Sequence, residues 1–178
     1  MAQMPILKYP DARLRQKCAT VETFDENLKK LVADMTDTMY AANGAGLAAI
    51  QVGVPIRLFI IEPEVAGRAP TEPVVTFINP EIIEISDEAQ TGDEGCLSFP
   101  GVFATVKRGM RAKVRALDLD GKPFEMEGEA LFGRALQHEN DHLIGRLLID
   151  MVGPVKREII KRKMKKEALA DAESTSAA

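Results

Sequence analysis

The pentapeptide H-E-N-D-H at residues 138–142 is the feature that most constrains how this chain can fold. In an α-helix, His138 and His142 would lie on the same face, where both imidazoles can bind one metal ion. The surrounding segment, residues 129–144, contains helix-forming residues with apolar side chains at helical spacing, and Gly145 can end the helix. We therefore predict a helix that carries a two-histidine metal site.

These two histidines are the only ones in the 178 residues, which argues against the alternative that their spacing is a coincidence on a solvated helix face. Glu139 would lie beside the metal, where a carboxylate can take a proton from metal-bound water and pass it to a leaving amine. A protein in which the metal only stabilises the fold is the non-catalytic alternative. Glu139 separates the two hypotheses, because a structural site has no need for it.

A catalytic metal usually has three protein ligands and one open position, so a third ligand is needed. The metzincin pattern would place a third histidine at the position of Leu148, so that pattern fails. Glu158 or Glu167 would make the chain a zinc endopeptidase, but both lie among lysines and are expected to pair with them. Cys96 is the stronger candidate, in a glycine-containing loop between strand-like segments, because a thiolate is an excellent ligand for a borderline-soft divalent ion.

The other cysteine, Cys18, has no potential ligand near it in the sequence, so we expect it to be a small buried apolar residue. Two cysteines do not make a disulfide framework, which favours a reducing compartment. No export signal is recognisable, and no apolar stretch approaches the roughly 20 residues of a membrane-spanning helix. We expect a cytoplasmic protein with neither a membrane nor a DNA partner.

The rest of the chain predicts an α+β fold. A capping box at Thr23 and Glu26 predicts the start of a helix, which Asn43 and Gly44 can end. Short β-branched or aromatic segments predict strands at residues 57–62, 74–78 and 81–86. A tight turn at residues 120–121 predicts a hairpin of residues 111–118 and 124–127. We expect antiparallel β-sheets packed around the central helix that carries the H-E-x-x-H motif, with another helix at the C-terminus.

The C-terminal segment is basic in an otherwise acidic chain of net charge −4, because residues 156–178 contain seven Lys and Arg and four Asp and Glu. Its apolar residues fall roughly on one side of a helix: Val155, Ile159, Ile160 and Met164. We expect residues 1–165 to form the catalytic domain. Residues 166–178 are expected to be the end of this helix and a frayed tail.

The segment at residues 44–51, GAGLAAIQ, carries weaker information. Gly44 and Gly46 allow another backbone or a substrate to approach closely. Gln51 is a neutral amide that could donate a hydrogen bond to an oxyanion, provided that the fold brings it to the metal.

Three separated segments together resemble the peptide deformylase family, whose motifs are G-x-G-x-A-A-x-Q, E-G-C-x-S and Q-H-E-x-D-H. In this chain they are GAGLAAIQ at residues 44–51, EGCLS at 94–98 and QHENDH at 137–142, in the same order and without a substitution at the fixed positions. The resemblance extends over residues 1–165 or so.

The resemblance implies that the chain removes the formyl group from the N-terminal formylmethionine of nascent polypeptides. It implies a metal held by Cys96, His138 and His142, with metal-bound hydroxide attacking the formyl carbon while Glu139 transfers the proton. In the family this metal is typically ferrous iron in the cell, often replaced by zinc, nickel or cobalt. A cysteine and two histidines suit several of these ions.

The resemblance also implies how the site is supported. The Gln51 side chain and the backbone N–H of Leu97 would stabilise the oxyanion together with the metal. Glu94 would pair with Arg108, an ion pair that we interpret as structural, holding the segment around Cys96 in place.

In the same family the peptide binds as an added strand, here near Ala45, Gly46 and Gly95, with the methionine side chain in an apolar pocket. Leu131 and Ala135 precede His138 on the same helix face and are expected to line that pocket. 

Two further features vary within the family. Phe103 stands where many bacterial members have an arginine or tyrosine that contacts the peptide, so contacts beyond the methionine are not predicted. The basic C-terminal helix docks on the ribosome in some members, and its charges would suit RNA phosphates. A solvated amphipathic helix packed on the domain is the preferred interpretation.

Overall fold

The computed structural model describes residues 2–176 as an α+β fold, as predicted. In chain order its elements are η1 (Ala12–Arg15), α1 (Glu26–Ala41), β1 (Gly46–Ala48), η2 (Ala49–Val52), β2 (Leu58–Ile61), β3 (Val75–Ile85), β4 (Ala89–Cys96), β5 (Phe99–Gly109), β6 (Arg111–Leu117), β7 (Pro123–Glu129), α2 (Leu131–Leu143), η3 (Leu148–Met151) and α3 (Pro154–Ser176), where η denotes a 3₁₀ turn. None of the described helices is long and apolar enough to cross a membrane.

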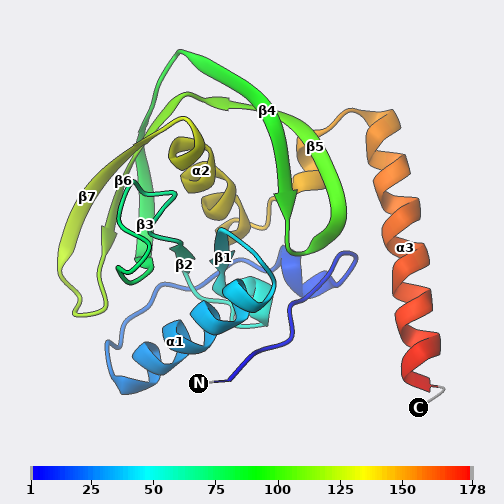
Figure 1. The fold of residues 1–178 in the computed structure, drawn as a ribbon, viewed down its shortest axis with the longest axis horizontal. Helices are drawn as coiled ribbons and strands as arrows, with labels where there is room; N and C mark the ends of the chain where they lie inside the picture. Colours follow the sequence, from blue (N-terminus) through cyan, green and yellow to red (C-terminus); the bar gives the residue numbers. More distant parts are fainter. Residues whose placement is uncertain (1, 177–178) are drawn as a thin grey trace.

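The strands form a five-stranded sheet in the order β1-β2-β3-β6-β7 and a two-stranded sheet of β4 and β5. All pairings within these sheets are antiparallel, as the sequence predicts. Helix α2 lies between the β4–β5 hairpin and the larger sheet in Figure 1. This arrangement confirms the prediction of sheets packed around a central helix.

The core is divided by the larger sheet. On one face, Leu136 of α2 packs in a buried cluster with Phe59 and Phe77 of β2 and β3. On the other face, Met35 and Met39 of α1 belong to a second cluster with residues of β1 and β2. Strand β2 is buried on both faces, because helices cover both sides of the sheet there. Cys18 is buried in the cluster under α2, as predicted for a small apolar residue.

The start of α1 differs from the prediction. Its N-cap is Asp25, whose side chain accepts a hydrogen bond from the Leu28 N–H at 3.1 Å, so the capping box predicted at Thr23 is wrong. The predicted end is correct. Asn43 adopts a left-handed conformation with φ of 56°, and the Gly44 N–H donates to the Met39 carbonyl at 2.9 Å.

The two strands predicted at residues 74–78 and 81–86 form one continuous strand, β3, with an irregularity between Ile78 and Glu81. Asn79 has a positive φ of 50°, and Pro80 has no N–H to donate to a neighbouring strand. The Asn79 side chain instead bonds both backbone groups of Val21. The break in sequence pattern therefore marks a bulge rather than a loop.

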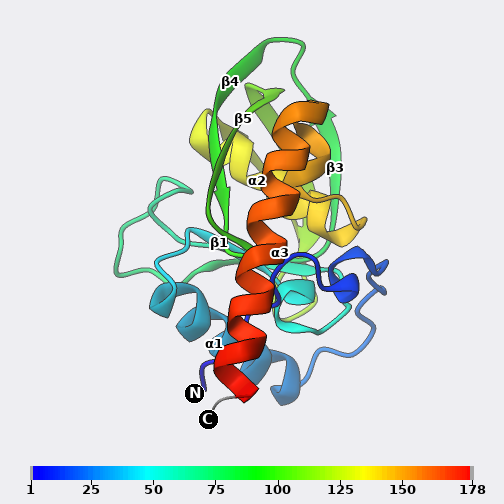
Figure 2. The same ribbon diagram turned by 90° about the vertical axis from the view of Figure 1, so that its right-hand side faces the viewer.

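Helix α3 stands beside β5 on the outside of the molecule in Figures 1 and 2. Of the four residues predicted to form its packed side, Ile160 and Met164 are buried against a cluster that includes Phe99 of β5, whereas Val155 and Ile159 are exposed. The division predicted at residue 165 falls inside α3 and stays a prediction. The last two residues of the predicted frayed tail, 177–178, lie outside the described residues.

Candidate active site

Helix α2 presents the two histidines to one place, as their spacing predicts. The rings of His138 and His142 lie edge to face with centroids 5.2 Å apart. The helix ends at Leu143, and Gly145 follows with a positive φ of 75°, consistent with its predicted role as a terminator. Because the opposite face of α2 packs on the larger sheet, the histidines are held between that sheet and the β4–β5 hairpin.

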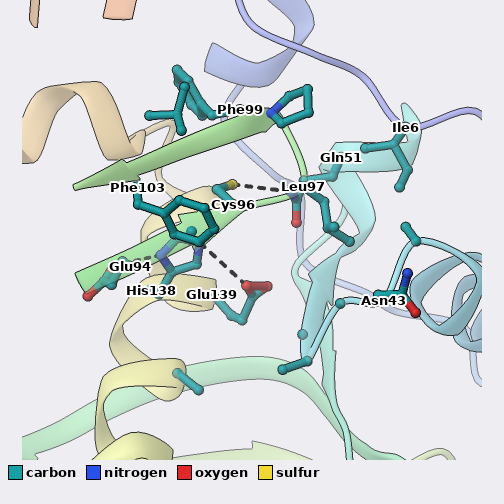
Figure 3. Close-up of a pocket in the computed structure, with 18 of the residues that line it drawn as sticks. Ile6, Asn43, Gln51, Glu94, Cys96, Leu97, Phe99, Phe103, His138 and Glu139 are labelled. Carbon is teal, nitrogen blue, oxygen red and sulfur yellow. Dashed lines mark hydrogen bonds and ion pairs between the residues drawn. The ribbon is translucent and has the colours of Figure 1, made fainter. Parts of the chain in front are cut away.

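Cys96 is the last residue of β4, which corrects the expectation that it lies in a loop. The pairing of β4 with β5 shifts register between Gly95 and Cys96, and such a bulge can re-aim a side chain. The Cys96 Sγ lies 3.5 Å from His142 Nε2. In Figure 3, Cys96, His138 and Glu139 approach one another at the pocket.

One ligand atom from each of Cys96, His138 and His142 lies within 4.8 Å of the others. A sulfur and two imidazole nitrogens at this separation fit the donor set of one divalent metal ion, with a fourth position left for water or substrate. Glu158, one of the two glutamates considered for the endopeptidase hypothesis, is on α3, and its side chain is 62% exposed and paired with Lys161. It does not belong to this group.

Glu139 lies beside the donor atoms, with its Oε1 3.7 Å from His138 Nε2. Its other oxygen, Oε2, is buried and has no hydrogen-bond partner among residues 2–176. Burial raises the pKa of Glu139 to about 7, and the charges of Glu94 and Asp141 act in the same direction. A carboxyl group that is poised near neutrality can both accept and release a proton.

Glu94 supports the histidine from β4. Its carboxylate accepts two hydrogen bonds from Arg108, at 2.8 and 2.9 Å, and pairs with His138 Nδ1 at 2.8 Å. Burial alone would raise the pKa of Glu94, but the hydrogen bonds from Arg108 and His138 outweigh it and hold the pKa well below its usual range. A carboxylate at Nδ1 favours the tautomer whose Nε2 can bind a metal. The expected Glu94–Arg108 pair therefore also orients a histidine.

Gln51 is brought to the site by the 3₁₀ turn η2. Its Oε1 accepts a hydrogen bond from the Ala48 N–H at 2.9 Å, which leaves the amide nitrogen facing β4. Nε2 donates to Ser98 Oγ at 3.0 Å and lies 3.6 Å from Cys96 Sγ. The condition that the sequence left open, that the fold brings Gln51 to the other site residues, is met.

A cavity of about 610 Å³ opens beside these groups. Its lining includes every residue predicted to bind substrate, together with Leu97: Ala45, Gly46, Gly95, Leu131 and Ala135. Phe103 also lines the cavity, and the residue is 67% exposed. The lining is predominantly apolar apart from the groups described above, which suits an apolar side chain held next to a polar reaction centre.

Residues 3–158 match the family model described as polypeptide deformylase. The chain belongs to the peptide deformylase family. The peptide deformylase of Brucella suis is 47% identical over 168 residues, which cover 94% of this chain and 95% of the relative. That of Zymomonas mobilis is 47% identical over 170 residues, which cover 94% and 96%.

Solved structures of peptide deformylases have the same fold. The enzyme from Legionella pneumophila matches with a TM-score of 0.88 and 46% identity, covering 96% of this chain and 98% of that one. The enzyme from Ehrlichia chaffeensis in complex with actinonin matches with a TM-score of 0.87 and 38% identity, covering 94% and 98%.

This deformylase removes the formyl group from the N-terminal formylmethionine of polypeptides, and the reaction depends on a metal. Three residues of the site had no role predicted from the sequence, although Ser98 and Asp141 stand at fixed positions of the motifs. Asp141 accepts a hydrogen bond from Arg108 at 2.6 Å, Ser98 accepts one from Gln51, and Arg134 donates one to Glu94 at 2.7 Å. Arg134 could have been found, because a charged residue four positions before His138 shares its helix face.

Proposed function

We propose that this deformylase holds one divalent metal ion with Cys96, His138 and His142, and that Glu139 transfers the proton during hydrolysis. The observation that carries the proposal is the buried Glu139 carboxylate, whose Oε2 has no hydrogen-bond partner among the described residues and which lies beside three donor atoms within 4.8 Å of one another. A metal bound there would act as a Lewis acid and lower the pKa of a bound water.

Glu139 takes the proton from the attacking water and delivers it to the leaving amine. Its pKa of about 7 supports both steps, because neither protonation state is strongly disfavoured near neutral pH. Gln51 Nε2 and the Leu97 backbone N–H stabilise the negative charge that develops on the formyl oxygen. The hydrogen bond from Ala48 to Gln51 Oε1 supports this role, since it holds the amide with its nitrogen toward Cys96.

The substrate peptide binds along β1. This strand is at the edge of its sheet and pairs with β2 alone among the described strands, so a peptide can add to its outer side. Ala45, Gly46 and Gly95 line the cavity at that place, and Leu131 and Ala135 contact the methionine side chain.

The replacement of Glu139 by glutamine tests the proton transfer. Glu139→Gln keeps the size of the side chain but cannot accept the proton, so kcat for a formyl-Met peptide should fall by about 10² to 10⁴ while the metal is retained. Glu88→Gln, at an exposed carboxylate, is the matched control and should leave kcat unchanged. Turnover at the wild-type rate in Glu139→Gln would contradict the mechanism.

The ligand set is tested separately by the metal content of Cys96→Ala. Without the thiolate only two protein ligands remain, so the purified variant should lose most of its metal. Full metal retention would contradict the proposal and favour another third ligand.

We further propose that the ion is ferrous iron in the cell, although the donor set also accepts zinc, nickel or cobalt. Metal analysis after anaerobic purification should then find iron in excess.

We also propose that the enzyme acts in the cytoplasm and that the basic face of α3 contacts ribosomal RNA. Lys165 and Lys166 support this, because both are exposed on α3. Replacing both lysines by glutamate should reduce the amount of protein that co-sediments with ribosomes and should make this binding less sensitive to salt. The rate of hydrolysis of a short peptide should be unchanged. Lys29→Glu, on α1, is the control with a single charge reversal elsewhere. Unchanged co-sedimentation of the double variant would exclude this contact.

A further inference from the structure

Arg134 is a buried cation in the wall of the active site that belongs to none of the three motifs. It lies one helical turn before His138 on α2, and only 7% of the residue is exposed. Burying a guanidinium is costly unless its charge and its N–H groups are satisfied. Its partners therefore indicate what this residue does.

A single nitrogen of Arg134 reaches both strands of the β4–β5 hairpin. Nη1 donates to Glu94 Oε2 at 2.7 Å, to the Val106 carbonyl at 3.0 Å and to the Gly92 carbonyl at 3.4 Å. Gly92 and Glu94 belong to β4, whereas Val106 belongs to β5. At Gly92 an added Cβ would lie 3.2 Å from Arg134 Nη2, so a side chain there would crowd the guanidinium.

These contacts join the two elements that carry the metal-binding residues. Cys96 is at the end of β4, and both histidines are on α2. The position of the hairpin relative to α2 therefore decides how far the thiolate lies from the imidazoles. Arg134 connects the hairpin to α2 one turn from His138.

Arg134 also acts on His138 through Glu94. Glu94 Oε1 pairs with His138 Nδ1 at 2.8 Å, and Oε2 accepts from Arg134. Arg108 donates a hydrogen bond to each of the two oxygens of Glu94, which fixes the orientation of the carboxylate. Two arginines also balance the negative charges of Glu94 and Asp141 in this buried cluster.

We infer that Arg134 is a positioning residue, which sets the geometry of the metal site by holding both the β4–β5 hairpin and the Glu94 carboxylate relative to His138. The inference rests on the proposed ligand set of Cys96, His138 and His142. Arg134 also lines the substrate cavity, so catalytic activity alone cannot test it. Metal binding is the deciding measurement.

The test compares the zinc-loaded wild type with Arg134→Met, which keeps an apolar stem but loses the charge and the hydrogen bonds. Loss of a residue that orients metal ligands typically weakens metal binding by ~10- to 100-fold. In competition with a chelator of known zinc affinity, Arg134→Met should release zinc at a correspondingly lower chelator concentration. After substitution with cobalt, its thiolate-to-cobalt absorption band should be shifted or weakened.

Arg134→Lys should recover part of the affinity, because it restores the charge beside Glu94 but its shorter side chain lacks the fixed planar geometry of the guanidinium. Arg115→Met is the matched control on β6, where the arginine is exposed and pairs with Glu125. It should behave as the wild type. If Arg134→Met does not fold, Arg134→Gln replaces it.

The inference would be overturned if Arg134→Met or Arg134→Gln folds and has the same zinc affinity and cobalt spectrum as the wild type. A reduced thermal stability in such a variant would show only a structural role. Cys96→Ala in the same cobalt experiment separates this failure from failure of the proposed function. Persistence of the absorption band in Cys96→Ala would mean that the ligand set itself is wrong.

Discussion

At the scale of single residues, two buried glutamates of the site have opposite electrostatic environments. Glu94 accepts hydrogen bonds from Arg108, Arg134 and His138, and its pKa is lowered despite burial. No described residue donates a hydrogen bond to Glu139 Oε2, and burial raises the pKa of Glu139 to about 7. In the proposed mechanism, a glutamate is thus kept charged where it orients His138 and can titrate where the proton is transferred.

The backbone of Gly46 lies against the Glu139 carboxyl group. A Cβ added at Gly46 would come within 3.1 to 3.3 Å of the carboxyl group of Glu139, so the carboxylate would have to shift by a few tenths of an ångström. Because a displacement of ~1 Å can cost about 100-fold in rate, we predict that Gly46→Ala lowers kcat/KM for a formyl-Met peptide by roughly tenfold. Steady-state kinetics measure this effect.

Gly153→Ala is the control for that substitution, since an added Cβ there meets no atom within 4 Å. It should leave kcat/KM unchanged. Equal kcat/KM values for Gly46→Ala and the wild type would contradict the prediction, because they would show that a Cβ at Gly46 does not displace the Glu139 carboxylate.

At the scale of elements, each helix is positioned by its apolar face, and α3 shows how narrow that face can be. Ile160 and Met164 belong to a buried cluster with Phe99 of β5 and Leu148 of η3, whereas the apolar Val155 and Ile159 of the same helix are exposed. A helix that packs against the rest of the domain along a narrow strip buries fewer of its apolar side chains than the sequence pattern predicts.

The adjacent isoleucines of α3 provide a matched pair. Ile160 is 2% exposed and Ile159 is 56% exposed. We predict that Ile160→Ala lowers the free energy of unfolding by about 2–4 kcal/mol through the lost burial and the cavity left behind. Ile159→Ala should change it by less than about 0.5 kcal/mol. Urea unfolding of both variants measures the difference, and equal losses would contradict the orientation of α3.

At the scale of the whole molecule, the active site lies where the two sheets face each other across α2. The larger sheet contributes Gly46, the hairpin contributes Glu94 and Cys96, and α2 contributes both histidines. No single element carries the chemistry, so the site exists only when the sheets and α2 are packed together.

The end of α3 should be dispensable for this packing. Its residues that belong to the core clusters end at Met164, which supports the proposed boundary of the catalytic domain at residue 165. We predict that removal of residues 166–178 changes the midpoint of thermal unfolding by less than about 3 °C, because little apolar burial is lost. Calorimetry of the truncated and full chains checks this. A decrease of 10 °C or more would place the boundary further along α3.

The sequence by itself determined the features that depend on local spacing or on a motif. The histidine pair follows from helical periodicity, and the hairpin of β6 and β7 follows from a turn dipeptide at residues 120–121. The prediction of Cys96 as a metal ligand depended on its flanking motif, because the neighbouring residues alone do not distinguish a metal-binding cysteine from a buried one.

Only the tertiary structure decided the contacts between distant segments. The hydrogen bonds from Arg134 and His138 to Glu94 and the approach of Gln51 to Cys96 join residues at least 40 positions apart in the chain. Which face of α3 is buried was decided in the same way. Local periodicity places side chains on a face of their own element, but the partner that the face meets depends on how the elements pack.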